Sequence, residues 1–173
     1  SDHIVENRYR CMDGAYKWIE WRGMAFAEQG EFYAVGRDIT ERRQAEEELR
    51  QYKHIVSNSM DMLALVDASF IYLAVNEAYL EALGKTRDQV VGHSVREVLG
   101  QELFDASIRP RAERCLRGEH IRYQEWLDLP GRRPAYFDVA GSPYRGTDGK
   151  VLGYVVTVRD ITELKDAEEK LRQ

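Results

Sequence analysis

Apolar and polar positions follow two different periods along the chain, and each period predicts one kind of element. Short apolar runs bounded by Gly, Asp or Asn predict strands, whereas apolar residues three and four apart predict helices. In residues 1–39 this pattern predicts three strands joined by two tight turns: Glu6–Asp13, Ala15–Ala27 and Glu31–Ile39, with turns at Asp13-Gly14 and Gln29-Gly30.

These three strands carry many aromatic side chains: Trp18, Trp21, Phe26, Phe32 and Tyr33. A sheet of about three strands without a covering layer cannot bury such a face by itself. We therefore expect residues 1–39 to be the C-terminal part of a domain. We also expect this part to pack against another surface, for example a second copy of the chain.

Residues 40–59 show helical spacing. Their apolar positions are separated by steps of four, three and four, as in a heptad seam: Ala45, Leu49, Tyr52 and Val56. Two interpretations fit this pattern. The helix is either a single amphipathic helix that lies on its own domain or one strand of a seam between two protomers. We favour the second, which predicts a homodimer.

Residues 60–162 predict one complete domain. Two strands, Met62–Asp67 and Phe70–Asn76, precede two short helices, Glu77–Leu83 and Thr86–Val91, which end at Gly84 and Gly92. A longer helix follows over Gln101–Arg117, and its Pro110 should kink it or start a new turn. Three more strands complete the domain: His120–Leu129, Ala135–Tyr144 and Val151–Thr162. This order predicts an α+β fold with helices on one face of an antiparallel sheet.

A repeated segment marks the end of each part. Arg37–Gln51 returns as Arg159–Gln173, identical at 11 of 15 positions with a constant offset of 122 residues. Each copy follows an apolar run and continues with helical spacing, so a joint from strand to helix is used twice, as in a tandem array. Within each copy, Asp38-x-x-Glu41 and Asp160-x-x-Glu163 predict a reciprocal cap at the start of the helix.

Composition excludes several functional classes. The 173 residues are 43% hydrophobic and 32% charged, with a net charge of −5, which disfavours a nucleic-acid partner. No apolar run approaches the ~20 residues of a membrane-spanning helix. The two cysteines, Cys11 and Cys115, show no metal-ligand spacing, which predicts free thiols, a cytoplasmic location and no metal site.

Enzyme signatures are missing from the sequence. There is no Gly-x-Ser-x-Gly, no phosphate-binding Gly-x4-Gly-Lys-Ser/Thr and no His-Glu-x-x-His, so we expect no catalytic activity. An enzyme on the same fold would need ionisable groups inside a pocket. Glu125 and Asp138 are the candidates, and the strand pattern leaves open which of them points inward.

Several motifs in order resemble one family, the PAS sensory domains with their C-terminal PAC motif. The motifs are Val75-Asn76-Glu77-Ala78, Gly84-Lys-Thr-Arg-Asp-Gln-Val-Val-Gly92, Asp148-Gly149-Lys-Val-Leu-Gly153 and Arg159-Asp-Ile-Thr-Glu163. The resemblance covers residues 50–173. Residues 5–51, with Met12-Asp-Gly-Ala-Tyr-Lys-Trp-Ile-Glu20, resemble the last three strands and exit helix of a preceding PAS domain.

The resemblance implies a fold and a division of the chain. The fold is a five-stranded antiparallel sheet with short helices on one face, flanked by linker helices. The division is a partial PAS domain (1–39), a linker helix (40–59), a complete PAS domain (60–162) and an exit helix (163–173). Asp160 and Thr162, with Asp38 and Thr40 in the other copy, match the joint through which the family relays signals. Capping of the following helix is the simpler role for the same four residues.

In this family a ligand lies between the sheet and the helices. The residues that we expect to line such a pocket are Leu65, Tyr79, Val95, Phe104, Ile108, Arg111, Cys115, Trp126, Phe137 and Val156. The cofactor is unknown. A flavin adduct of the LOV type is disfavoured because Val95 stands where that branch has its cysteine. Histidine-ligated haem is disfavoured because the long helix contains no histidine.

The resemblance thus predicts a cytoplasmic sensory and relay module of a larger signalling protein. It would bind a small ligand or cofactor, dimerise, or do both. Its output domain, of the histidine kinase or diguanylate cyclase type, would lie beyond Gln173. The alternative is a ligand-free dimerisation scaffold, and pocket volume separates the two. A cavity large enough for a small ligand favours sensing, whereas one filled by Phe104, Ile108, Phe137 and Val156 favours a scaffold.

Overall fold

The computed structural model describes residues 3–26 and 31–172, which form two compact units, residues 1–54 and 55–173. The boundary between the units falls near the end of helix α1 (Thr40–Ser57). The turn predicted at Gln29-Gly30 lies outside the described residues, as do the side chains of Phe26, Phe32 and Tyr33.

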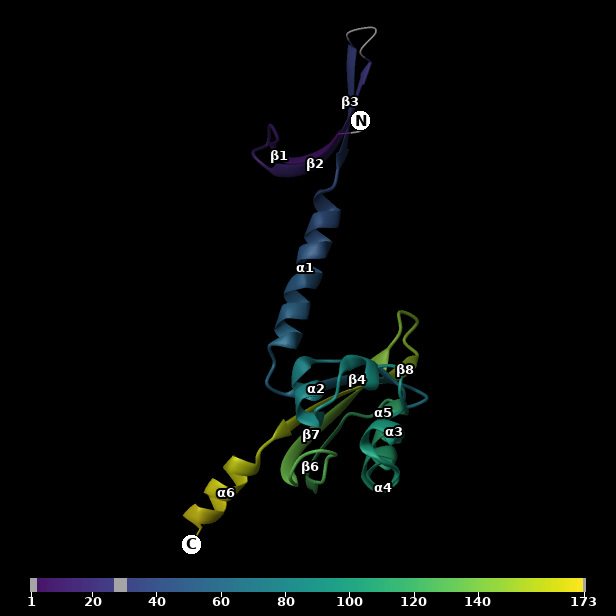
Figure 1. The fold of residues 1–173 in the computed structure, drawn as a ribbon, viewed down its shortest axis with the longest axis vertical. Helices are drawn as coiled ribbons and strands as arrows, with labels where there is room; N and C mark the ends of the chain where they lie inside the picture. The colour runs from purple at the N-terminus through teal and green to yellow at the C-terminus, as the bar shows by residue number, and fades with distance from the viewer. Residues whose placement is uncertain (1–2, 27–30, 173) are drawn as a thin grey trace. The chain divides into compact units, whose positions relative to one another are not determined.

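The first unit contains a three-stranded antiparallel sheet in the order β1-β2-β3, formed by β1 (His3–Arg10), β2 (Tyr16–Phe26) and β3 (Glu31–Asp38) (Figure 1). Gly14 forms the first turn with a φ of 86°, a left-handed conformation that favours glycine. On the sheet, the Trp21 indole N–H donates to Asn7 Oδ1 at 3.0 Å. Helix α1 follows β3.

The second unit is built on a five-stranded sheet in the order β5-β4-β8-β7-β6, and every neighbouring pair is antiparallel. The strands are β4 (Met62–Asp67), β5 (Tyr72–Val75), β6 (Ile121–Leu127), β7 (Ala135–Arg145) and β8 (Val151–Asp160). Because β4 pairs with β8, the first and last strands of the domain lie side by side at the centre of the sheet. The predicted α+β fold class is confirmed.

Short helices lie between β5 and β6 in the chain and pack on one face of this sheet (Figure 1). They are α2 (Glu77–Leu83), the 3-10 turn η1 (Arg87–Gln89), α3 (Val95–Leu99), α4 (Gln101–Leu103), the π-helical turn η2 (Phe104–Ile108) and α5 (Arg109–Leu116). Helix α6 (Thr162–Leu171) follows β8. The hydrophobic core lies between the sheet and these short helices.

Strand alternation explains which residues enter this core. On β7, Ala135, Phe137 and Val139 are buried, and the residues between them are less so. On β4, Met62, Ala64 and Val66 are buried in the same alternating way. A single well-buried side chain of this kind contributes about 1.5–3 kcal/mol to folding.

The helical stretch predicted over residues 101–117, with a kink or a new turn at Pro110, is confirmed. The chain forms α4, the π turn η2 and α5 in succession, and the Arg109 N–H donates to the Phe104 carbonyl five residues earlier. Pro110 explains the interruption because it has no N–H to donate, and its ring would contact the carbonyl of Ala106 in a regular α-helix. A wider turn before the proline avoids that contact, and α5 starts with Pro110 in its first turn.

One helix was not predicted from the sequence, although a local signal for it was present. Ser94 Oγ accepts from the Glu97 N–H at 3.2 Å, and Glu97 Oε2 accepts from the Ser94 N–H at 2.8 Å. This reciprocal cap of the form Ser-x-x-Glu starts α3. The neighbouring helix predicted over 86–91 is shorter than expected, because only the 3-10 turn η1 forms.

Candidate ligand cavity and signal-relay joint

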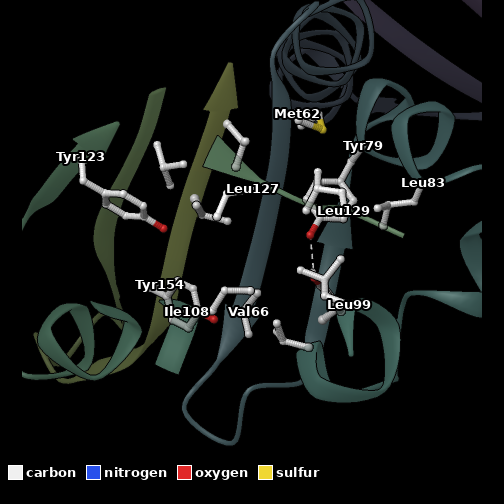
Figure 2. Close-up of a pocket in the computed structure, with 15 residues that line it drawn as sticks. Met62, Val66, Tyr79, Leu83, Leu99, Ile108, Tyr123, Leu127, Leu129 and Tyr154 are labelled. Carbon is white, nitrogen blue, oxygen red and sulfur yellow. Dashed lines mark hydrogen bonds between the residues drawn. The ribbon is translucent and has the colours of Figure 1, made fainter. Parts of the chain in front are cut away.

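A cavity of about 70 Å³ lies between the inner face of the sheet and the short helices (Figure 2). Its lining combines eleven apolar residues with four tyrosines and contains no charged side chain. The lining residues are Met62, Val66, Tyr72, Tyr79, Leu83, Val95, Leu99, Ile108, Tyr123, Leu127, Leu129, Val139, Tyr154, Val156 and Val158. The arrangement can enclose a small, mainly apolar molecule and offer it phenol hydroxyls.

Two of the tyrosines bond to each other across the cavity wall. The hydroxyl oxygens of Tyr72, on β5, and Tyr79, on α2, lie 2.5 Å apart, and their rings meet edge to face at 5.6 Å. Burial raises the pKa of the Tyr79 phenol to about 12, and burial together with Tyr79 raises the pKa of Tyr72. Both phenols are therefore neutral at physiological pH.

Tyr154 is placed differently. It comes from the central strand β8, is only 4% exposed, and lines the cavity. Its hydroxyl has no hydrogen-bond partner among the described residues. Every fully enclosed side-chain polar atom of the described residues does have a partner, so the Tyr154 hydroxyl is not fully enclosed. The Tyr154 oxygen therefore reaches open space in the cavity. Burial raises the pKa of this phenol as well, so it is an uncharged donor and acceptor.

A polar cluster lies beside Tyr123 of the cavity lining. Arg111 on α5 pairs with Glu125 on β6 at 2.7 Å, and Ser107 Oγ donates to the same carboxylate at 2.8 Å. The Arg111 guanidinium also lies 3.8 Å from the centre of the Tyr123 ring. Burial alone would raise the pKa of Glu125, but its hydrogen bonds with Arg111 and Ser107 hold that pKa below the ordinary value.

The same cluster shows which carboxylate points inward. Glu125 lies on the helix-facing side of β6, whereas Asp138 lies on the outer face and pairs with Arg122 at 2.7 Å. A pocket enzyme needs a carboxyl group with a raised pKa or a free carboxylate near its substrate. Glu125 has a lowered pKa and is occupied by Arg111.

The structure places the ten expected pocket residues in three groups. Tyr79, Val95, Ile108 and Val156 line the cavity. Phe104, Cys115 and Phe137 are buried in the core beside it, and Arg111 lies at its edge in the pair with Glu125. Leu65 and Trp126 lie on the outer face of the sheet, where Trp126 is 54% exposed and contacts Tyr136.

The placement of Leu65 and Trp126 corrects the expectation for these two residues. Successive strand residues point to opposite faces, so the buried Val66 and Leu127 set the opposite direction for their neighbours. Eleven further lining residues were not among those predicted from the sequence, and Tyr72, Tyr154 and Val139 are examples from the strands. The same alternation would have indicated the examples once one inward-pointing residue on each strand was known.

The joint between β8 and α6 is held by side-chain hydrogen bonds. Asp160 Oδ1 accepts from Thr162 Oγ1 at 2.6 Å and from the Thr162 N–H at 3.0 Å. Thr162 Oγ1 in turn accepts from the Tyr136 N–H on β7 at 2.9 Å, and Arg132 pairs with Asp160 at 2.6 Å. Burial alone would raise the pKa of the Asp160 carboxyl group. The contacts with Thr162 and Arg132 outweigh burial, so the pKa is below its ordinary value.

The joint between β3 and α1 repeats this arrangement. Asp38 Oδ1 accepts from Thr40 Oγ1 at 2.6 Å and from the Thr40 N–H at 3.0 Å, and Thr40 Oγ1 accepts from the Trp18 N–H at 2.9 Å. A cation also lies over the equivalent ring in each copy, Arg43 over Trp18 and Lys165 over Tyr136. The two joints therefore share their hydrogen bonds as well as their sequence.

A reciprocal cap was predicted at the start of each helix, and for α6 this prediction is wrong. The helix begins at Thr162, the residue before it makes no side-chain cap, and Asp160 bonds to a residue only two positions later. Asp160 is the last residue of β8, so it lies too far from the helix for Glu163 to complete a capping box.

Asn76 connects three elements near the cavity. Its side chain is buried and accepts from the N–H groups of Leu63 and Tyr79 at 3.0 and 3.1 Å. Its amide donates to the carbonyls of Asp61 and Val56 at 2.9 and 3.2 Å. One side chain thus links the last turn of α1, the start of β4 and the start of α2, and α2 carries Tyr79 into the cavity wall.

The residues of the predicted seam lie exposed on α1. This helix buries no residue among those described, and Leu49, Tyr52 and Val56 are 55%, 67% and 45% exposed. Ala45 is exposed as well. An apolar stripe of this kind is what a partner helix would cover.

A family model described as PAS fold matches residues 56–166, which is more than half of the chain. The chain belongs to the PAS family. The matched region includes the cavity, its short helices and the joint after β8. The preceding three-stranded sheet lies outside it.

Two curated relatives with much longer chains are similar to parts of this chain. A protein of Sinorhizobium fredii, named only as uncharacterized, is 26% identical over 96% of this chain and 21% of its own length. The aerobic respiration control sensor protein ArcB of Escherichia coli is 30% identical over 57% of this chain and 13% of its own. This chain therefore spans about a fifth or less of these relatives, and the sensor protein supports a signalling sensor role for the PAS domain.

Solved structures share the PAS fold. The PAS domain of a protein from Colwellia psychrerythraea has a TM-score of 0.56 at 15% identity, covering 66% of this chain and 98% of that one. The phage VqmA–DPO complex has a TM-score of 0.58 at 17% identity, covering 73% and 59%. Among the described helices, none is both long and apolar enough to cross a lipid bilayer.

Proposed function

We propose that residues 56–166 are a non-enzymatic PAS sensory module of a larger cytoplasmic signalling protein, which binds a small molecule in the cavity. We propose that the module passes the state of the cavity through β8 and the Asp160–Thr162 joint to α6. Beyond α6 it would control an output domain of the histidine kinase or diguanylate cyclase type. The module would act as a homodimer through the seam on α1.

One observation carries this proposal. Strand β8 supplies Tyr154, Val156 and Val158 to the cavity lining and ends at Asp160, which organises the start of α6. A change at the cavity that shifts β8 therefore acts directly on the residue that positions the exit helix. A strand and helix connected in this way can adopt two discrete arrangements, as a signalling element needs.

The first joint extends the proposal to the N-terminal unit. This joint, at Asp38 and Thr40, has the same hydrogen bonds as the second joint, and it follows three strands paired in chain order, as β6, β7 and β8 are in the second unit. We propose that residues 3–38 are the back half of another PAS module, so that two identical joints act in series.

A ligand-free scaffold is the second candidate, favoured by cavity size. At about 70 Å³ the cavity is far below the ~300 Å³ at which drug-sized pockets begin.

One experiment separates the sensor from the scaffold. The chain is purified, its absorption spectrum is recorded, and after denaturation the released material is analysed by mass spectrometry. A released small molecule supports the sensor. Its absence, with no binding of small probes, favours the scaffold.

The relay is tested separately in the intact receptor. Asp160→Ala removes the acceptor for Thr162 and the partner of Arg132 but leaves the core untouched, so output should change while the domain still melts cooperatively. Asp148→Ala, in the exposed β7–β8 turn, is the matched control. A normal response in Asp160→Ala would remove this residue from the relay.

A further inference from the structure

The chemistry of the cavity lining restricts what the cavity can hold. None of its residues is charged, and the nearest ion pair, Arg111 with Glu125, is internally satisfied by contacts of 2.7 and 3.3 Å. A charged ligand would lose its hydration without gaining a counter-ion, which is strongly unfavourable. The ligand should therefore be neutral.

The volume of the cavity restricts the size of the ligand. One water-sized group needs roughly 10–15 Å³ of such space. The 70 Å³ present thus corresponds to a molecule of about five to seven non-hydrogen atoms, such as a single ring or a short branched chain. Large flat cofactors exceed this space.

One polar position remains open inside the apolar lining. The hydroxyls of Tyr72 and Tyr79 share one hydrogen bond, in which one donates and the other accepts, and the Tyr123 ring lies against Arg111. Tyr154 is only 4% exposed and lines the cavity, and its hydroxyl has no protein partner among the described residues. Because this hydroxyl is not fully enclosed, it remains free to form a hydrogen bond with a polar group of a ligand. Figure 2 shows Tyr79, Tyr123 and Tyr154 around the same space.

We infer that the cavity binds a small, uncharged, mainly apolar molecule of about one ring, held by a single hydrogen bond to the Tyr154 hydroxyl. This inference rests on the proposed ligand-binding function and names the class of ligand. Selectivity then comes from the absence of charge in the lining and from one hydroxyl, rather than from a set of ionic contacts.

Three single-ring probes test the inference on the full chain: phenol and toluene, which are equal in size, and benzoate, which is charged and two non-hydrogen atoms larger. Binding is followed by nuclear magnetic resonance titration of the methyl groups that line the cavity. Phenol should bind about three- to tenfold more tightly than toluene because only phenol can bond to Tyr154. Benzoate should cause no shift at the same concentration.

Tyr154→Phe isolates the hydroxyl. In this variant the affinity for phenol should fall about three- to tenfold, to that of toluene, while toluene binding persists. Tyr144→Phe, at the exposed end of β7, is the matched control and should change neither affinity. If Tyr154→Phe does not fold, the wild-type comparison of the three probes still decides.

The outcomes separate the inference from the proposed function. Benzoate binding as tight as phenol binding, or an unchanged phenol-to-toluene ratio in Tyr154→Phe, overturns the inference and leaves a ligand-binding module. No binding of any probe, with nothing released on denaturation, overturns the ligand-binding function and the inference together. A water held by Tyr154 that phenol does not displace also overturns the inference.

Discussion

Arg159 forms a two-pronged ion pair with Asp61, with nitrogen–oxygen distances of 2.6 and 2.8 Å across 98 residues of sequence. Asp61 precedes β4, and its carbonyl accepts from Asn76. Arg159 directly precedes Asp160 of the exit joint. The segment that enters the domain is therefore tied to the strand by which the chain leaves it.

The first prediction concerns acid stability. The hydrogen bond from Arg159 lowers the pKa of Asp61, and the pKa of Asp160 is lowered as well. A carboxyl group with a lowered folded-state pKa stabilises the fold above its unfolded pKa of about 3.9 and loses this effect as pH falls through the folded pKa. The free energy of unfolding should be level from neutral pH to about pH 5 and fall below about pH 4.

Arg159→Gln tests the source of this acid dependence. Urea denaturation across this pH range should show a shallower acid loss in the variant, since the pKa of Asp61 then returns toward its ordinary value. Arg145→Gln removes the same charge from a side chain bonded only to a carbonyl, at Gly149, and should keep the wild-type slope. Equal slopes in all three proteins would contradict the prediction.

The second prediction concerns Asn76. Asn76→Ala should lower the free energy of unfolding by about 2–4 kcal/mol, because it removes four hydrogen bonds at a buried position. Asn76→Asp keeps the acceptor oxygen but turns the second oxygen of a buried carboxylate toward the carbonyls of Asp61 and Val56, so its effect should be at least as large. Gln124→Ala, at an exposed position of β6, should remain within about 0.5 kcal/mol of the wild type. An equal effect of Asn76→Ala and Gln124→Ala would exclude the connecting role.

The third prediction concerns the seam on α1. If the apolar stripe pairs with a second copy, Leu49→Asp should shift the chain from dimer to monomer in analytical sedimentation, because a buried carboxylate in the seam has no partner. Gln51→Asp adds the same charge on the opposite side of the helix and should leave the dimer intact. A dimer that survives Leu49→Asp would exclude this seam.

The fourth prediction concerns alkaline pH. Burial raises the pKa of Tyr72, Tyr79, Tyr123 and Tyr154. Groups with a raised folded-state pKa support stability below their unfolded pKa of about 10 and lose it as pH rises toward the folded value, about 12 for Tyr79. Phenolate absorbance should therefore rise later for four of the ten tyrosines than in the denatured chain.

Tyr79→Phe checks this assignment because it should reduce the number of tyrosines that ionise at raised pH from four to three. Tyr144→Phe should leave that number unchanged. If folded and denatured chains gave the same absorbance curve, the four phenols would not be enclosed as described.

The sequence predicted the strands and helix α2 well, because the turn residue Gly84 and the cap residue Asn76 mark the ends of α2. It predicted less well which face of the sheet each strand residue occupies, because a shift of one residue in the strand register moves every side chain to the opposite face. On β6, aromatic residues stand on both faces, with Tyr123 inward and Trp126 outward. The π turn before Pro110 was beyond prediction because helical periodicity carries no signal for it.

The repeated joint also fixes the phase of the helix that it starts. Ala45 and Leu49 stand five and nine residues after Thr40, and Ala167 and Leu171 stand five and nine after Thr162, exposed on α6. The exit helix therefore presents its apolar residues at the same rotation from the joint as α1. The unit between the two joints therefore receives and passes on a helix whose apolar residues have the same phase relative to its joint.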